Sequence, residues 1–163
     1  SAASDVYKRQ IFIVALTASQ HFPAILARPC ANIADWSAVP MPIILVLDDS
    51  ATMVMSLSHI LKGAGYEVET GMNGREGITK LSGGLKPAAI LTDLNMPELD
   101  GIGFIKEARK IASARFTPII VLTTESGGRK RDEARAAGAS GWLTKPAEPN
   151  QLLSVVKQLC PVK

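Results

Sequence analysis

Four short apolar runs in the chain each end at residues that could take part in chemistry. The residues at these ends are Asp48 and Asp49, Asp93, Thr123 and Thr124, and Lys145. Short apolar runs are typical of buried strands, and the carboxyl ends of parallel strands meet at one edge of a sheet. The sequence therefore predicts that three carboxylates, a hydroxyl and a lysine lie together at such an edge.

Three carboxylates at one site need compensation, because like charges raise one another's pKa or recruit a cation. All the donors are oxygens, and no Cys or His accompanies them. Such a set favours a hard ion, and Mg²⁺ fits because it keeps several waters and leaves room for an anionic partner. We therefore expect Mg²⁺ as the cofactor.

A lysine beside carboxylates and a divalent ion indicates a phosphoryl group as the remaining partner. A metal ion, an ammonium group and a hydroxyl together neutralise its oxygens, and phosphoryl transfer depends mainly on positioning and charge stabilisation. A carboxylate can itself be the nucleophile and form an aspartyl phosphate. The residues alone thus predict metal-assisted phosphoryl chemistry on a carboxylate.

Helical patterns separate the apolar runs. The clearest one places Met53, Leu57, Ile60 and Leu61 on one face, the spacing of an amphipathic helix. Further helices are predicted over residues 73–83, over a segment that carries Ile102, Ile105, Ala108 and Ala112, over 129–137, and over a segment from Leu152 to Leu159. Tyr66–Thr70 alternates apolar and polar residues, which predicts a half-exposed edge strand.

Strand alternates with helix five times, which predicts an α/β fold with a parallel sheet and helices on both faces. Right-handed crossovers leave few topologies. We expect a doubly wound, five-stranded parallel sheet with five helices, in the flavodoxin-like order 2-1-3-4-5; that order is taken from known folds and not worked out from the residues.

Composition excludes several classes of protein. Among 163 residues, 47% are hydrophobic and only 5% aromatic, which indicates an aliphatic core and argues against a disordered chain. The formal charge of +3 gives no reason to expect nucleic acid as a partner, and no apolar stretch approaches the roughly 20 residues of a membrane span. Cys30 and Cys160 form neither a metal-ligand spacing nor a disulfide framework, which favours a cytoplasmic location.

Residues 1–40 differ from the rest of the chain because they show no sustained period. The stretch from Asp5 to Gln10 resembles the in-frame translation of a transposon-end adapter, and the native protein would then begin at Met41. A secretory signal is the alternative, with Lys8 and Arg9 before the short apolar run from Ile11 to Leu16. We expect 1–40 to be a leader outside the fold, disordered or a translation artefact, and 41–163 to form the domain.

The segments LVLDDS, ILTDLNMPELDG, PIIVLTTES and GASGWLTKP resemble the four signature stretches of response-regulator receiver domains, in order and at the usual spacing. The resemblance covers residues 41–163. It implies that Asp93 is the phosphoacceptor and also a ligand of Mg²⁺, that Asp49 binds Mg²⁺ directly and Asp48 through water, and that the backbone carbonyl of Asn95 is a further ligand.

The same resemblance assigns the residues that act after transfer. It implies that the Thr123 hydroxyl and the Lys145 ammonium bind the phosphoryl group, and that the peptide bond between Lys145 and Pro146 is cis. Trp142 falls at the position of an aromatic residue that moves between exposed and buried states. We add Thr124, beside Thr123, to these switch positions.

Asn95 and Glu125 match positions that tune spontaneous dephosphorylation in CheY-type chemotaxis proteins. The last predicted helix lies near the end of the sequence, which favours a single-domain messenger over a transcription factor. The implied partners are a sensor histidine kinase as donor, a target such as the flagellar motor switch or a phosphorelay protein, and a phosphatase. Ala147 departs from the phenylalanine that is common there, which leaves the shape of the output face open.

Two other functions are consistent with parts of this pattern. An aspartate-nucleophile phosphatase of the haloacid-dehalogenase type would need an Asp-x-Asp motif and a cap insertion, whereas this chain has adjacent Asp48 and Asp49. A pseudo-receiver would be an interaction module that is never phosphorylated. We expect a signalling switch that assists only its own phosphorylation and dephosphorylation, and is not otherwise an enzyme.

Overall fold

The computed structural model describes residues 40–125 and 127–162. The leader predicted over residues 1–40 therefore lies outside the described part except for Pro40, and so does Cys30. None of the described helices is both long enough and apolar enough to cross a membrane.

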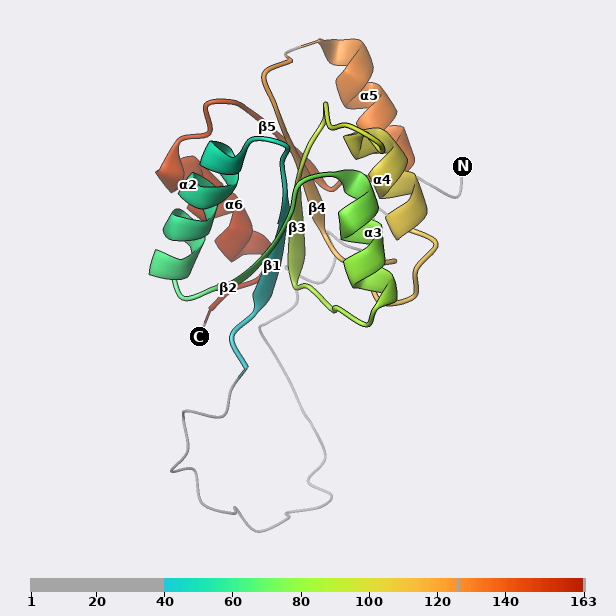
Figure 1. Cartoon of the computed structure of the whole chain (residues 1–163). Coiled ribbons are helices and arrows are strands. Elements are labelled where there is room, and N and C mark those ends of the chain that lie inside the picture. Colours follow the sequence, from blue (N-terminus) through green and yellow to red (C-terminus); the bar gives the residue numbers. More distant parts are fainter. Residues whose placement is uncertain (1–39, 126, 163) are drawn as a thin grey trace, which may run out of the picture. The chain divides into compact units, whose positions relative to one another are not determined.

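Five strands alternate with five helices along the described chain (Figure 1). In chain order the elements are β1 (Ile43–Leu47), α2 (Ala51–Gly63), β2 (Glu67–Gly71), α3 (Gly74–Ser82), β3 (Ala89–Asp93), α4 (Gly101–Ala108), β4 (Ile119–Thr123), α5 (Gly128–Ala137), β5 (Gly141–Thr144) and α6 (Pro149–Leu159). All strand pairs are parallel, in the order β2-β1-β3-β4-β5. The predicted fold class and strand order are confirmed.

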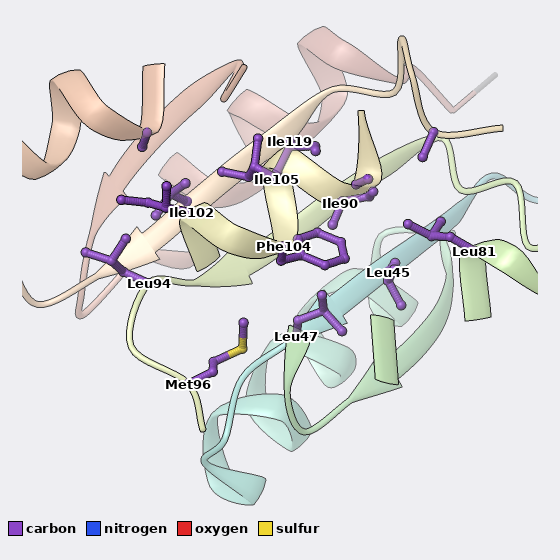
Figure 2. Packing of buried hydrophobic residues seen from close by; sticks show 14 residues of the cluster. Leu45, Leu47, Leu81, Ile90, Leu94, Met96, Ile102, Phe104, Ile105 and Ile119 are labelled. Atoms are coloured by element: carbon purple, nitrogen blue, oxygen red, sulfur yellow. The ribbon is translucent and has the colours of Figure 1, made fainter. Parts of the chain in front are cut away.

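Helices cover both faces of the sheet, with α2 and α6 on one side and α3, α4 and α5 on the other (Figure 1). Successive side chains of a strand point to opposite faces, so the central strands feed two cores. Leu45, Leu47 and Ile90 pack with Phe104 and Ile105 of α4 in one core (Figure 2). The other core joins the sheet to α2 and α6, and it includes Ile44, Val46, Leu91, Leu57 and Val156.

Three helices begin at polar residues that follow strand ends closely. The side chains of Ser50, Asn73 and Asp100 accept hydrogen bonds from backbone N–H groups in the first turns of α2, α3 and α4. Such N-caps satisfy donors that a helix leaves unpaired. These short connections bring the starts of the helices to the carboxyl edge of the sheet.

One predicted helix is shorter than expected. The pattern extended it to Ala112, but α4 ends at Ala108, and Ala112 is exposed in the following turns. The guanidinium of Arg109, the first residue after α4, donates to the backbone carbonyls of Ala114, Arg115, Thr117 and Gly138 at 2.7–3.2 Å. These bonds pair carbonyls of the segment after α4 and of the C-cap of α5, and they hold that segment in a non-helical path.

Candidate functional site

The register of the sheet brings the predicted site residues to one edge. Leu47 pairs with Thr92, so the next residues along β1 and β3 are Asp48 and Asp93. Thr123 pairs with Thr144 at the ends of β4 and β5, and the Lys145 N–H donates to the Thr123 carbonyl at 2.7 Å. The convergence expected from the strand ends is therefore present in the structure.

The three carboxylates form a compact cluster. Asp48, Asp49 and Asp93 each offer one oxygen, and these oxygens all lie within 4.8 Å of one another. Asp48 is 1% exposed and Asp93 is 8% exposed, while Asp49 is exposed. Buried carboxylates this close need a cation. An all-oxygen donor set with one exposed member fits Mg²⁺, which keeps several of its waters.

Lys145 supplies positive charge to the same cluster. Its Nζ lies 2.5 Å from Asp48 Oδ2 and 3.3 Å from Asp93 Oδ1, and only 13% of its side chain is exposed. The peptide bond to Pro146 is cis, as the resemblance implied. Lys145 thus reaches from β5 across the sheet edge to the ends of both β1 and β3.

The environment of Asp93 raises the pKa of its carboxyl. Burial is the main cause that raises the pKa of its carboxyl above the ordinary aspartate value, and the charge of Asp48 adds to this rise. Lys145 and the Leu94 N–H, which donates to Asp93 Oδ1 at 2.7 Å, act in the opposite direction. Added positive charge beside Asp93 would therefore favour its ionised, nucleophilic form.

The loops after β3 and β4 meet beside this cluster. The amide of Asn95 donates to Glu125 Oε1 at 3.0 Å, and both residues lie at or near the surface. The Thr123 side chain is fully buried, and its hydroxyl accepts from the Glu125 N–H at 3.1 Å. Thr124 points to neither core and is exposed. The structure thus links two residues that the sequence could only place in separate loops.

Trp142 lies on β5, opposite Val121 of β4. It is partly buried and packs against the core under α3, α4 and α5. It is not part of the carboxylate cluster, and its role as a moving aromatic stays a prediction.

Gly101 is a site residue that the sequence analysis did not single out. A Cβ built on it would lie 2.3 Å from the carbonyl oxygen of Asp93, and its N–H donates to the Leu94 carbonyl at 2.8 Å. Only glycine allows α4 to start this close to the phosphoacceptor candidate. A glycine directly after the cap residue Asp100 was the available sequence signal.

Comparison with known proteins shows the family of the chain. The model of the response regulator receiver domain matches residues 44–157. The chemotaxis protein CheY1 of Helicobacter pylori is 36% identical over 110 residues, which cover 67% of this chain and 89% of that protein. A protein-glutamate methylesterase/protein-glutamine glutaminase of Archaeoglobus fulgidus is 42% identical over 106 residues, but the match spans only 29% of its length.

A solved structure agrees with these sequence matches. The chemotaxis protein CheY4 of Vibrio cholerae superposes with a TM-score of 0.70 at 41% identity, and the match covers 74% of this chain and 99% of that one. Together with the strand order and the carboxylate cluster, these matches show that the chain belongs to the family of response regulator receiver domains.

Proposed function

We propose that this receiver domain is a phosphorylation-activated switch in which Asp93 accepts a phosphoryl group from a phosphohistidine of a sensor kinase. The observation that carries the proposal is the joint placement of three carboxylates and Lys145 at one edge of the sheet. One oxygen from each carboxylate lies within 4.8 Å of the other two, and Lys145 contacts Asp93. Asp48, Asp49, Asp93 and the Asn95 carbonyl would hold Mg²⁺ there. When bound, Mg²⁺ supplies the charge that neutralises the carboxylates and the incoming phosphoryl oxygens.

The residues around Asp93 have different roles in phosphoryl transfer. Leu94 N–H and Lys145 both contact Oδ1, so we assign the new bond to phosphorus to Oδ2. The bond between phosphorus and the donor nitrogen breaks as that bond forms. Lys145 and the Thr123 hydroxyl then bind the phosphoryl oxygens, which makes charge-assisted hydrogen bonds in a largely buried site.

These contacts explain how a local reaction becomes a signal. Phosphorylation adds a charge of roughly −1.5 to −2 and three acceptor oxygens. A full shift of a two-state equilibrium needs about 5.5 kcal/mol, which two or three charge-assisted hydrogen bonds supply in order of magnitude. Thr123 ends β4 and Lys145 directly follows β5, so their movement toward Asp93 would alter the surface of the loops after these strands and the setting of Trp142 on β5.

The biological setting that we propose is chemotaxis. Relatives named as chemotaxis proteins match along nearly their whole length, which supports a CheY-like messenger in the cytoplasm. Its donor would be a histidine kinase, and its target a protein such as the flagellar motor switch or a phosphorelay protein. Membership of the receiver family removes the support for the haloacid-dehalogenase alternative, while the pseudo-receiver is left for experiment.

The proposal is tested by incubating the full chain with acetyl phosphate and Mg²⁺ and measuring intact mass. We expect the addition of one phosphoryl group in the wild type and none in Asp93→Asn. Trp142 fluorescence, read in a Trp36→Phe background that leaves it as the one tryptophan, should change with donor and Mg²⁺ in the same way. A wild-type protein whose mass never changes would be a pseudo-receiver.

A further inference from the structure

Asn73 is a buried polar residue outside the site described above. It lies between β2 and α3 and is 7% exposed. Its Oδ1 accepts from the Glu76 N–H at 2.8 Å and caps α3, while its Nδ2 donates to Glu98 Oε1 at 3.3 Å. Helix capping uses only the oxygen, so the amide nitrogen has a separate partner on another loop.

That partner belongs to the loop that follows the phosphoacceptor. We call residues 94–100 the acceptor loop; it starts directly after Asp93 and contains Asn95. Glu98 has φ of 64°, in the left-handed region that is unfavourable for a residue with a Cβ and persists where the surroundings hold it. A bond to the buried Asn73 side chain is one such constraint.

The neighbouring residue holds the same loop from the same side. The Gly74 N–H donates to the Leu99 carbonyl at 3.2 Å, and a Cβ on Gly74 would lie 2.5 Å from that oxygen. The start of α3 therefore contacts the distal end of the acceptor loop closely, while Gly101 holds the end of the loop next to Asp93.

We infer that Asn73 is a positioning residue for Asp93 and for the backbone carbonyl of Asn95, acting through Glu98 and the acceptor loop. The inference rests on the proposed phosphorylation of Asp93 in the presence of Mg²⁺. The geometry of a metal ligand depends on the groups that orient it, and losing such a group weakens metal binding. The effect is expected in the Mg²⁺ requirement of the reaction and not only in stability.

The test uses substitutions that separate the two roles of Asn73 in the full chain. Asn73→Ser keeps an oxygen that caps α3 but loses the donor to Glu98, and Glu98→Ala removes the acceptor at an exposed position. We expect each to raise about tenfold both the Mg²⁺ concentration for half-maximal phosphorylation by acetyl phosphate and the Mg²⁺ concentration for half-maximal stabilisation against urea. The double variant, Asn73→Ser with Glu98→Ala, should show no further rise, because both changes remove the same hydrogen bond. Glu98→Gln keeps a carbonyl oxygen that can accept the bond from Asn73, so its Mg²⁺ requirement should equal that of the wild type.

Glu76→Ala is the matched control at the same helix start. It removes the bond from the Met72 N–H to Glu76 Oε2, of 2.9 Å, without touching Glu98. It should lower the thermal midpoint and leave the Mg²⁺ requirement unchanged. An unchanged requirement in Asn73→Ser and Glu98→Ala, or an equal rise in Glu76→Ala, would overturn the inference alone. A wild type that gains no phosphoryl group at any Mg²⁺ concentration would instead overturn the proposed function on which it rests.

Discussion

The ammonium group of Lys145 lies 2.5 Å from Oδ2 of Asp48, although 97 residues separate them in the chain. Asp48 is almost completely buried, and Lys145 is its close counter-charge in this structure. Lys145, which we propose binds the phosphoryl group after transfer, is thus paired with the carboxylate cluster before transfer. Its removal should leave like charges uncompensated.

Lys145→Ala should lower the free energy of unfolding by about 3 kcal/mol at neutral pH in EDTA, because it leaves a buried carboxylate without its partner. Urea unfolding measures this, and added Mg²⁺ should restore part of the loss. Lys80→Ala is the control: it removes a comparably short ion pair with Glu69, of 2.7 Å, but with side chains 36% and 41% exposed. Lys80→Ala should lower the free energy of unfolding by less than about 1 kcal/mol. Equal losses in both variants would contradict the assigned role of Lys145.

Asp49→Asn should separate metal binding from folding, because Asp49 is the exposed member of the cluster. In EDTA, we expect the variant to be no less stable than the wild type. A ligand at 100 times its dissociation constant stabilises the folded state by about 2.7 kcal/mol. The wild type should gain this from Mg²⁺, and Asp49→Asn should lose most of the gain at the same concentration. Equal Mg²⁺ stabilisation of both proteins in urea titrations would exclude Asp49 as a ligand.

Gly101→Ala should disrupt the site through the backbone. The added Cβ would meet the Asp93 carbonyl at 2.3 Å, so the loop or the start of α4 must move. We expect a loss of roughly 1–3 kcal/mol in stability and a strong loss of phosphorylation. Gly128→Ala is the control, because its Cβ would meet nothing within 4 Å at the start of α5. That change should be neutral or stabilise by up to about 1 kcal/mol. Normal phosphorylation of Gly101→Ala would show that this close approach is not required.

The hydrogen bond between Asn95 and Glu125 should affect the lifetime of the phosphorylated state. It joins the loops after β3 and β4 at the surface beside the cluster, so its loss should admit water more readily to the phosphorylated Asp93. Glu125→Ala should therefore shorten the half-life several-fold, read by intact mass after removal of the donor. Because the two residues are in contact, the double change with Asn95→Ala should be non-additive. Additive effects would mean that the two residues act separately.

Cys160 should make stability depend on alkaline pH. Burial raises the pKa of its thiol from 9.0 to about 11. The folded state favours the neutral thiol, so this contribution is fully present below about pH 9 and is lost as the pH rises to about 11, by up to about 3 kcal/mol.

The measurement is urea unfolding of the wild type and Cys160→Ala across that range. Tyr66, whose pKa is also raised by burial and then by Cys160, adds to the loss in both proteins. The difference between the two proteins therefore reports the thiol together with its smaller charge effect on Tyr66. Parallel pH profiles would contradict the prediction.

Local patterns were sufficient to predict much of this protein. Apolar runs and helical spacing depend on neighbouring residues, so five strands, five helices and the carboxyl-edge position of Asp93 and Lys145 could be predicted from them. The end of α4 could not, because Arg109 after it makes contacts that reach as far as Gly138, 29 residues away. The roles of the site residues stay predictions for the experiments above.

Tertiary structure alone decided which side chains are partners. The sequence pattern indicates that Asp48, Asp93 and Lys145 lie at the ends of strands. Sheet register and loop closure determine that Lys145 lies nearer to Asp48 than to Asp93. The bonds from Asn95 to Glu125 and from Asn73 to Glu98 likewise join separate loops. Sequence periodicity reports which face a residue occupies, whereas a hydrogen bond requires two distant backbones to be placed within a few tenths of an ångström, and only the packed fold does that.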